Sequence, residues 1–394
     1  MGLDTADATA LPTATARAPV PSQGRGAWPT GVARGLLMGS AMRPCLFLVA
    51  LAIPAASACT AVDIADRGGA VETIDGWDDA ALDIYFIPGG GAAEDRLAAE
   101  VAAARREIRV AMYNITSARL GHALIDARRR GVAVEVLWDA KQMAQDYNTL
   151  DDELTAAGLV ITPVTNRAAA FSTVHDKLAI IDGERVTLGS ANWGTSALYD
   201  NNESLLVFES VAMAAVVDAQ LDEIRDQVKV RRAGDLAGPV QLHFSPEDRL
   251  DRVVQAAIDS AHDRVYVAVF SLRLRNLTDA LIRAHGRGVR VFVATDRKQS
   301  IGSNEDERLR AAGVPVVEAL NATGAFTAMH HKFAVVDDTV LVGAYNWTYA
   351  ATFQNDEDLA VIRDPEVAAA FAGEMGRVWR RYGAHRRCRF QRSS

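Results

Sequence analysis

The sequence is poor in the features that mark several protein classes. It has three cysteines in 394 residues, which excludes a disulfide-dense scaffold and a zinc ribbon. Aromatic residues make up only 7% of the chain, and 29 glycines and 12 prolines are too few for a low-complexity protein. No apolar run reaches the roughly 20 residues that a transmembrane helix needs. The remaining composition is that of a globular protein, and the length predicts two domains that each bury a core.

The net charge of the chain is moderately negative, which argues against a surface that binds polyanions throughout. Forty-two basic and 50 acidic residues give a formal net charge of −8. Such a balance argues against a protein that binds nucleic acid over its whole surface, although a local basic site remains compatible with it. Seven arginines lie between Arg377 and Arg392, and we expect residues 384–394 to form a basic tail. This tail is either a solvated helix end or a contact for anionic lipid or nucleic acid.

The N-terminal segment has the pattern of a targeting sequence. Residues 1–41 are rich in Ala, Pro, Thr and Gly, which predicts disorder. Arg43 then precedes the apolar run Cys45–Ile53, and small residues follow, as in a signal peptide. Because a signal peptide normally starts near its methionine, we expect translation to begin at Met38 or Met42. Residues 1–58 are thus predicted to be a disordered leader plus signal peptide, and the protein to be exported.

A cysteine follows the predicted cleavage region. The segment Ala56-Ser57-Ala58-Cys59 resembles a bacterial lipoprotein box, with Ala56 where leucine is usual. This resemblance implies that Cys59 carries a lipid and holds the protein at a membrane surface. The alternative is secretion with Cys59 free or bonded to Cys388. The predicted location is therefore the bacterial periplasm, lipid-anchored to a membrane, or the medium.

The body of the chain contains one pattern written twice. Residues 109–142 align without gaps with residues 266–299, at an offset of 157 positions. Residues 174–208 align with residues 329–362 at an offset of 155 positions, with a gap of one residue before Gly343. Self-similarity on this scale indicates a duplicated structural unit.

The two copies predict an α/β fold. β-branched runs at Val265–Phe270 and Val289–Ala294 indicate buried strands, and apolar residues at helical spacing lie between them. We expect two homologous α/β/α sandwich repeats with mixed sheets, spanning residues 77–235 and 239–383. Pseudo-two-fold packing would make the protein a monomer that contains an internal pseudo-dimer.

The residues able to carry chemistry recur in both copies. The first set is His175, Lys177, Asp182, Ser190, Asn192 and Glu203. The second set is His330, Lys332, Asp337, Asn346 and Glu357, with Ala344 at the serine position. The histidine and the lysine are two residues apart, which places them on one face of a strand. A histidine and a lysine at this spacing usually have a structural role when they occur once. The recurrence of the whole set 155 residues later favours a functional role.

These residue types suit phosphoryl transfer. Lysine neutralises phosphate oxygens and asparagine donates further hydrogen bonds, so we expect phosphate contacts from Lys177, Ser190, Asn192, Lys332 and Asn346. One neutral histidine can attack phosphorus while a second, protonated histidine supplies a proton to the leaving oxygen. Glu203 or Glu357 could fix the tautomer of each ring. Apart from the two motif histidines, no residues in the sequence have the spacing of metal ligands. We therefore predict metal-independent chemistry without a cofactor.

Other repeated residues are given structural interpretations. Trp193 and Trp347 are expected to pack in the core, and His331 to point away from His330. Residues 139–142 and 296–299 recur at strand ends, where either substrate contacts or loop salt bridges are plausible. The run Gly89-Gly90-Gly91 lacks the lysine of a phosphate loop and is expected to form a turn.

The pattern HxK(x)4D(x)6GSxN resembles the phospholipase D superfamily. The first copy matches it without departure, whereas the second has five residues before Gly343 and Ala344 in place of serine. The stretch beginning at Met329 is closest in character to cardiolipin hydrolases and bacterial endonucleases. The resemblance implies a covalent phosphohistidine on one histidine, with the other as acid and then base. It points to His175 as the nucleophile and His330 as the acid; swapped roles remain open because of Ala344.

The sequence is compatible with more than one class of substrate. Hydrolysis of phospholipids to phosphatidic acid is the first expectation, because export places the enzyme beside membranes and the acidic charge disfavours nucleic acid. The alternatives are a secreted or periplasmic endonuclease and a phosphatidyltransferase similar to cardiolipin synthase. A non-enzymatic lipid- or nucleic-acid-binding module would require a damaged motif, of which Ala344 is the only sign.

Overall fold

The computed structural model describes residues 71–77, 80–166, 172–228, 239–320 and 327–383. The predicted leader, signal peptide, Cys59 and basic tail lie outside these residues. Among the described helices, none combines the length and the apolar character needed to cross a membrane.

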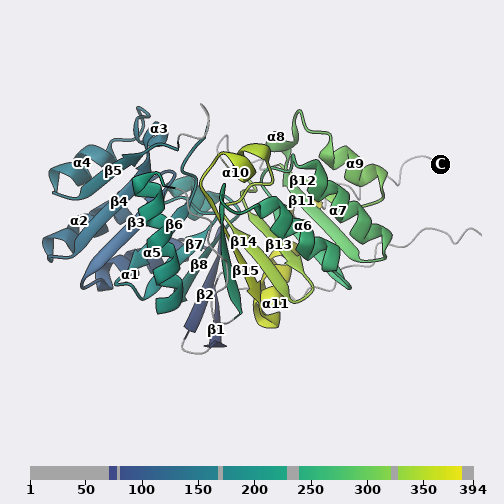
Figure 1. The fold of residues 1–394 in the computed structure, drawn as a ribbon, viewed down its shortest axis with the longest axis horizontal. Coiled ribbons are helices and arrows are strands. Elements are labelled where there is room, and N and C mark those ends of the chain that lie inside the picture. Colours follow the sequence, from purple (N-terminus) through teal and green to yellow (C-terminus); the bar gives the residue numbers. More distant parts are fainter. Residues whose placement is uncertain (1–70, 78–79, 167–171, 229–238, 321–326, 384–394) are drawn as a thin grey trace, which may run out of the picture. The chain divides into compact units, whose positions relative to one another are not determined.

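The first repeat follows strand–helix alternation (Figure 1). Its elements are β1 (Val71–Trp77), β2 (Ala80–Ile87), α1 (Ala92–Ala103), β3 (Glu107–Met112), α2 (Ala118–Arg129), β4 (Ala133–Asp139), α3 (Ala140–Met143), α4 (Leu150–Ala156), β5 (Val160–Val164), β6 (Lys177–Ile181), β7 (Arg185–Gly189), the π-helical turn η1 (Ser196–Asp200), β8 (Glu203–Glu209) and α5 (Val211–Asp226).

The second repeat has the same order of elements. They are β9 (Val240–Ser245), α6 (Leu250–Ser260), β10 (Arg264–Val269), α7 (Arg275–Gly286), β11 (Arg290–Asp296), α8 (Arg297–Ser300), α9 (Glu305–Ala311), β12 (Val316–Ala319), β13 (Lys332–Val336), β14 (Thr339–Gly343), α10 (Tyr349–Phe353), β15 (Glu357–Arg363) and α11 (Pro365–Gly383).

The two sheets have the same topology, which confirms the predicted duplicated α/β fold. The first sheet runs β1-β2-β8-β7-β6-β3-β4-β5, and the second runs β9-β15-β14-β13-β10-β11-β12 when read from the equivalent end. Both are mixed, because β3–β4 and β10–β11 pair in parallel while β6 and β13 run antiparallel to β3 and β10. The extra strand β1 pairs with β2, so the first repeat starts before the predicted residue 77.

The predicted elements form where their patterns place them. The helix expected between the two β-branched runs is α7, which places Leu277, Ala280, Leu281 and Ala284 on one fully buried face. The β-branched runs form β10 and β11, whose interior positions are almost entirely buried because helices or the other sheet cover both faces. Gly91 begins α1 in a left-handed conformation, so the glycine run is a turn as expected.

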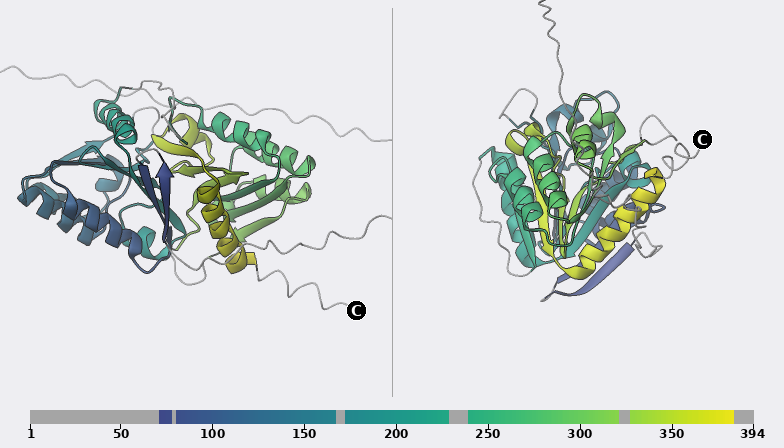
Figure 2. Two further views of the ribbon diagram at one scale, coloured as in Figure 1. Left: turned by 90° about the horizontal axis from the view of Figure 1, so that it is seen from below. Right: turned by 90° about the vertical axis from the view of Figure 1, so that its right-hand side faces the viewer.

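Three apolar cores hold the molecule together. One lies between the helices α1, α2 and α4 and the first sheet, and a second lies between α6, α7 and α9 and the second sheet. The third contains residues of both sheets together with α5 and α11, including Leu221 and Phe371. The helices α5 and α11 are seen beside their sheets in Figure 2. The repeats therefore share one core, as the pseudo-dimer interpretation requires.

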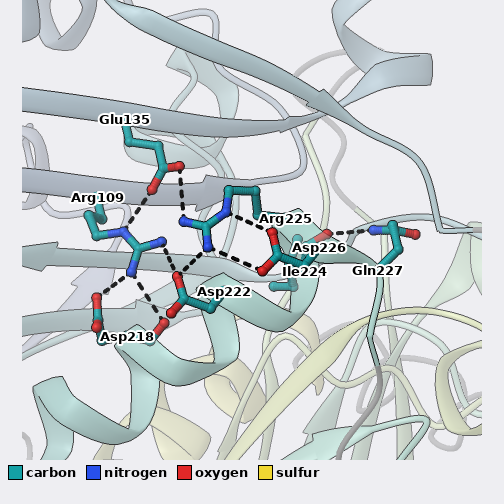
Figure 3. A network of polar contacts seen from close by, with 8 residues as sticks. All are labelled: Arg109, Glu135, Asp218, Asp222, Ile224, Arg225, Asp226 and Gln227. Atoms are coloured by element: carbon teal, nitrogen blue, oxygen red, sulfur yellow. Dashed lines mark hydrogen bonds and ion pairs between the residues drawn. The ribbon is translucent and has the colours of Figure 1, made fainter.

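The helix α5 contacts its sheet through an ion network as well as through the apolar residues that it places in the shared core. Arg109 of β3 pairs with Glu135 at 2.7 Å and Asp222 at 2.8 Å, and also with Asp218 (Figure 3). Arg225 of α5 lies 3.6 Å from the other oxygen of Glu135.

The equivalent positions of the second repeat are aromatic. Tyr266 and Phe292 have ring centroids 5.8 Å apart, and Phe292 and Trp379 have centroids 5.0 Å apart. At these equivalent positions, the first repeat therefore has an ion network and the second repeat has aromatic packing.

Candidate active site

Main-chain hydrogen bonds between the repeats place the two histidines. The N–H of His175 donates to the carbonyl oxygen of Asp356 at 2.9 Å. The N–H of His330 donates to the carbonyl oxygen of Asn202, also at 2.9 Å. Each histidine is thereby attached to the residue just before the glutamate of the other repeat. The two sets of predicted residues therefore meet at one interface.

The side chains repeat this crossed arrangement. His175 Nδ1 lies 2.6 Å from Glu357 Oε2, and His330 Nδ1 lies 2.7 Å from Glu203 Oε1. Both glutamates are fully buried. Because Nδ1 of each ring is occupied by a carboxyl group, Nε2 is the nitrogen available to a substrate.

The glutamates are themselves held in place. The side-chain amide of Asn355 donates to Glu357 Oε1 at 3.0 Å, and that of Asn201 donates to Glu203 Oε1 at 3.0 Å. Sequence analysis assigned the glutamates to the site but not to their partners, because crossing between repeats is a tertiary property. Neither supporting asparagine was predicted, although each stands two residues before its glutamate in both copies.

The lysines lie directly beside the histidines. Lys177 Nζ donates to the carbonyl oxygen of His175 at 2.5 Å, and Lys332 Nζ donates to that of His330 at 2.7 Å. Both lysines are almost completely buried. Burial lowers the pKa of Lys332 to about 7, although Glu203 opposes this shift.

Two aromatic residues of the site were missed from the sequence. The Tyr113 ring meets His175 edge-on with centroids 4.9 Å apart, and the Phe270 ring meets His330 with centroids 4.5 Å apart. Lys177 Nζ lies 5.1 Å from the Tyr113 centroid, which is cation–π range. Tyr113 and Phe270 align in the repeats and each follows a buried strand, and these two signals could have identified them.

Burial keeps both imidazoles neutral in the free protein. It lowers the pKa of His330 to about 4, with the attraction of Glu203 acting in the opposite direction. Burial, assisted by the charges of Lys177 and Lys332, holds the pKa of His175 well below its usual value. A neutral imidazole has a free lone pair and can attack phosphorus.

The two glutamates differ in charge. Burial would raise the pKa of Glu203, but His330 and Lys332 outweigh it, so that the pKa falls below its usual range. Burial raises the pKa of Glu357 to about 8, against the opposing charges of Lys177 and Lys332. Near neutral pH, Glu203 is therefore ionised and Glu357 is protonated.

The asparagines and the serine of the motif take different places. The Oδ1 atoms of Asn192 and Asn346 are buried without a hydrogen-bond partner in the described part of the chain, and the phosphate contact of both asparagines stays a prediction. Ser190 is fully buried; its Oγ accepts the N–H of Ser204 at 3.0 Å and hydrogen-bonds Glu203. The expectation of a direct phosphate contact from Ser190 is thus corrected, because its hydroxyl supports Glu203 instead.

The aspartates of the motif do not reach the site. Asp182 follows the last residue of β6, about 16 Å along the chain from Lys177 at a strand rise near 3.3 Å per residue. Its carboxylate accepts the N–H groups of Arg105, Arg106 and Glu107 at 2.7 to 3.1 Å.

Asp337 does the same at the end of β13. It accepts the N–H groups of His262, Asp263 and Arg264, each at 2.9 Å. Both aspartates have a positive φ, 55° for Asp182 and 51° for Asp337. Their assignment as catalytic residues is therefore corrected: they fasten a turn to the start of β3 and β10. The turn residues that follow, Gly183 and Asp338, carried this signal in the sequence.

The repeated strand-end segments position the histidines indirectly. Asp139 caps α3 through the N–H groups of Lys141 and Gln142, and its Oδ2 accepts the N–H of Val174 at 3.0 Å. Asp296 likewise caps α8 and accepts the N–H of Met329 at 3.2 Å. Each aspartate thus fixes the position of the residue just before a histidine. This role differs from both roles expected for these segments, a substrate contact and a loop salt bridge.

The remaining predicted residues have structural roles. Trp193 and Trp347 are buried in the outer cores, as expected. His331 points away from the site, and its Nε2 lies 2.7 Å from Glu374 of α11. Among the residues that the structure describes, no group of three or more His, Cys, Asp or Glu is arranged to hold a metal ion. Metal independence stays a prediction.

The comparison with known families agrees with this geometry. Residues 97–225 and 254–379 match the family described as "Cardiolipin synthase, PLD-like domain", which is more than half of the chain and includes both repeats. The chain belongs to the phospholipase D superfamily. The resemblance inferred from the motifs is confirmed.

Several members of the superfamily are similar in sequence or structure. The mitochondrial cardiolipin hydrolase of Xenopus tropicalis is 39% identical over 118 residues, 29% of this chain and 54% of that protein. The phospholipase D of Rickettsia conorii is 26% identical over 150 residues, 37% of this chain and 72% of that protein. The chain spans about half the length of the curated cardiolipin hydrolases that it matches.

A solved structure shares the fold across both repeats. The phosphatidylserine synthase of Haemophilus influenzae superimposes with a TM-score of 0.59 over 75% of this chain and 86% of that one. Its sequence identity is 12%, so the likeness concerns the fold alone.

Proposed function

We propose that the protein is a phospholipase D-type phosphodiesterase that hydrolyses phospholipids to phosphatidic acid. The observation that carries this proposal is the crossed site, in which two His–Glu pairs with buried glutamates join different repeats beside two buried lysines. Lysines and asparagine amides suit an anionic phosphate, and paired imidazoles suit attack and protonation. The relatives named cardiolipin hydrolase and phospholipase D support a phosphodiester in a lipid.

The proposed reaction has two steps. Nε2 of one imidazole attacks phosphorus and forms an N–P bond while the bond to the leaving oxygen breaks, and the other imidazole protonates that oxygen. Water then attacks the phosphohistidine, loses a proton to the second imidazole, and releases the phosphate monoester. Burial keeps the pKa of both imidazoles low in the free protein. An anionic substrate between the lysines would raise the pKa of the protonating imidazole, because a nearby negative charge favours the imidazolium form.

A substrate panel in EDTA tests this proposal. The protein is incubated with labelled phosphatidylcholine, cardiolipin and single-stranded DNA, and the products are separated by chromatography. We expect phosphatidic acid or its cardiolipin-derived equivalent, undiminished by EDTA. Cleavage of DNA alone would support the endonuclease alternative, and exchange of the headgroup with an added alcohol without net hydrolysis would support a phosphatidyltransferase.

Two variants test the shared site. His175→Ala and His330→Ala should each lower turnover of phospholipid by about a thousandfold or more, because each removes one of two cooperating groups. His122→Ala is the matched control, since His122 is exposed and pairs with Glu153, which is also exposed. Full activity in either site variant, with a normal thermal midpoint, would contradict the shared site.

We also propose that the protein is exported and held at a membrane through a lipid on Cys59. The proposal is supported by the apolar run Cys45–Ile53 and by the small residues before Cys59. Mass spectrometry of the mature protein should find a diacylglyceryl-modified Cys59 at its N-terminus. An intact Met1 would contradict export, and an unmodified mature N-terminus would contradict the anchor.

A further inference from the structure

Both histidines lie at the edge of the sheets where the parallel strands end. The end of β3 pairs with Lys177, the first residue of β6, and the end of β10 pairs with Lys332, the first residue of β13. His175 and His330 each stand two residues before that lysine, just outside the strand. Their side chains are 12% and 13% exposed, whereas the glutamates that contact them are fully buried. Solvent therefore reaches the two rings at this edge, which we call the site edge.

Five segments that leave the site edge carry an exposed large apolar side chain. Two of them follow β4 and β11, and one follows β12, because these parallel strands end there. The other two follow β7 and β14, which run antiparallel to β6 and β13 and so return to the same edge. The helices α3, α8 and α10 of these segments lie along the upper side of the molecule in Figure 1. The five side chains are Tyr147, Tyr199, Ile301, Leu320 and Tyr349.

The opposite edge has fewer exposed side chains of this kind. Of the eight that are exposed among the described residues, Val160 and Val211 lie away from the site edge. Val160 is the first residue of β5, which runs toward the site edge, and Val211 begins α5 after β8 has run away from it. Single exposed apolar residues are normal on a protein surface. Their concentration around the entrance to a site instead indicates a binding surface.

Tyr349 is held in place by its neighbours. Its ring centroid lies 4.7 Å from that of Phe353, and the guanidinium carbon of Arg249 lies 4.6 Å from the Phe353 centroid. Arg249 follows β9, which also ends at the site edge. Tyr349 is nevertheless 62% exposed. A ring that is already ordered loses little conformational entropy when it enters another phase, and tyrosine is enriched where membranes meet water.

Ile301 combines exposure with nearby positive charge. It is 74% exposed, and its carbonyl oxygen accepts a hydrogen bond from the Arg273 guanidinium at 3.1 Å. Arg297 and Lys298 of α8, a few residues earlier, are exposed as well. An apolar side chain beside cations suits an anionic bilayer, because the side chain can enter the acyl boundary while the cations stay with the headgroups.

We propose that the site edge is a membrane-binding surface, on which Ile301 and Tyr349 insert into a bilayer that contains anionic phospholipid. This inference rests on the proposed hydrolysis of phospholipids and adds how the enzyme reaches its substrate. The phosphodiester of a lipid lies in the headgroup layer of the bilayer. A protein bound through the site edge holds its imidazoles against that layer, so the acyl chains stay in the membrane during the reaction.

A bilayer substrate and a soluble substrate separate membrane binding from chemistry. On vesicles of phosphatidylcholine and phosphatidylglycerol, Ile301→Ser and Tyr349→Ser should each lower kcat/KM by about tenfold, because each removes most of an inserted apolar surface. Turnover of dibutyroylphosphatidylcholine, which is monomeric in water, should change by less than about twofold. Val160→Ser and Val211→Ser are the matched controls, since both residues are exposed at the opposite edge, and they should alter neither rate.

Insertion can be measured without any reaction. In the His175→Ala background, Ile301→Trp and Val160→Trp each place an added indole at one of the two edges. Vesicles with brominated acyl chains should quench the added fluorescence of Ile301→Trp and leave that of Val160→Trp unchanged. Equal quenching of the two, or quenching of neither, would overturn the inference.

The remaining outcomes distinguish the inference from the function on which it rests. Equal losses on vesicles and on the soluble lipid would overturn the inference, because the two residues would then act on the chemistry. A dimer that Ile301→Ser converts to a monomer in analytical ultracentrifugation would also overturn it, since a second copy of the chain would then cover the edge. Absence of turnover on both lipids would overturn the proposed hydrolysis instead, and the quenching measurement would still report whether the site edge enters a bilayer.

Discussion

At the scale of single residues, the site is built from rings that shield charges. Tyr113 and Phe270 stand edge-on to the two histidines and lie near the two lysines. Burial raises the pKa of Tyr113 to about 12, so its hydroxyl is neutral throughout the physiological range. What the two positions share is therefore the ring and not the hydroxyl.

We predict that Tyr113→Phe keeps kcat within about threefold of the parent, since it copies Phe270 of the other half. Tyr113→Ala should lower kcat by about tenfold or more, because it exposes His175 and removes a cation–π contact of about 1 kcal/mol or more to buried Lys177. Steady-state kinetics on phosphatidylcholine checks both. A Phe variant as damaged as the Ala variant would show that the hydroxyl matters.

At the scale of elements, the motif's aspartates connect strands to turns. Burial would raise the pKa of Asp337, but the N–H groups of Arg264, His262 and Asp263 outweigh it and hold the pKa below its usual value. A carboxylate with a depressed pKa contributes stability above its unfolded pKa and loses that contribution as pH falls through the folded value.

We predict that Asp337→Asn lowers the free energy of unfolding by about 1 to 3 kcal/mol at pH 7, because it weakens three charge-assisted hydrogen bonds. The difference from the parent should narrow as pH falls below about 4. Denaturant unfolding at several pH values measures this. The folded variant should keep its kcat. Loss of turnover without loss of stability would show that Asp337 has a catalytic role.

The docking of α5 gives a second prediction at this scale. Arg109 is 11% exposed and holds three carboxylates, so Arg109→Ala should lower the free energy of unfolding by about 1 to 3 kcal/mol. Arg129→Ala is the matched control, since Arg129 pairs with Asp126 at the surface and should change stability by less than about 0.5 kcal/mol. Equal effects would show that the network in Figure 3 adds nothing to docking.

The elements themselves were largely readable from the sequence, and their contacts were not. Alignment of the two copies identified the strands, the helices, and the histidine, lysine and glutamate of each half that meet at the site. It misassigned Asp182 and Asp337 because equal spacing in two copies reports conservation of a structure as well as of a reaction. It also could not pair His175 with Glu357, since that contact joins residues 182 positions apart in different repeats.

At the scale of the whole molecule, the repeats are parts of one cooperative unit. A single core contains residues from both sheets and from α5 and α11, and main-chain hydrogen bonds cross between the repeats at both histidines. Neither half can lose its structure without exposing the shared core of the other.

We therefore predict one calorimetric unfolding transition for residues 71–383. Phe371→Ala, in the shared core, should lower the free energy of unfolding by about 3 to 5 kcal/mol and keep the transition single. Leu124→Ala, in the outer core of the first repeat, is the comparison and should behave in the same way. Two resolved transitions in either variant would contradict a common folding unit.

The crossed His–Glu pairs have a consequence for how such a protein can change over time. A substitution at one glutamate impairs an imidazole encoded more than a hundred codons away, so the duplicated segments cannot diverge separately at these positions. Recombination that replaced one repeat with that of a distant homologue would have to supply a glutamate that fits the histidine of the retained repeat. At these positions the two duplicated repeats are therefore expected to change together.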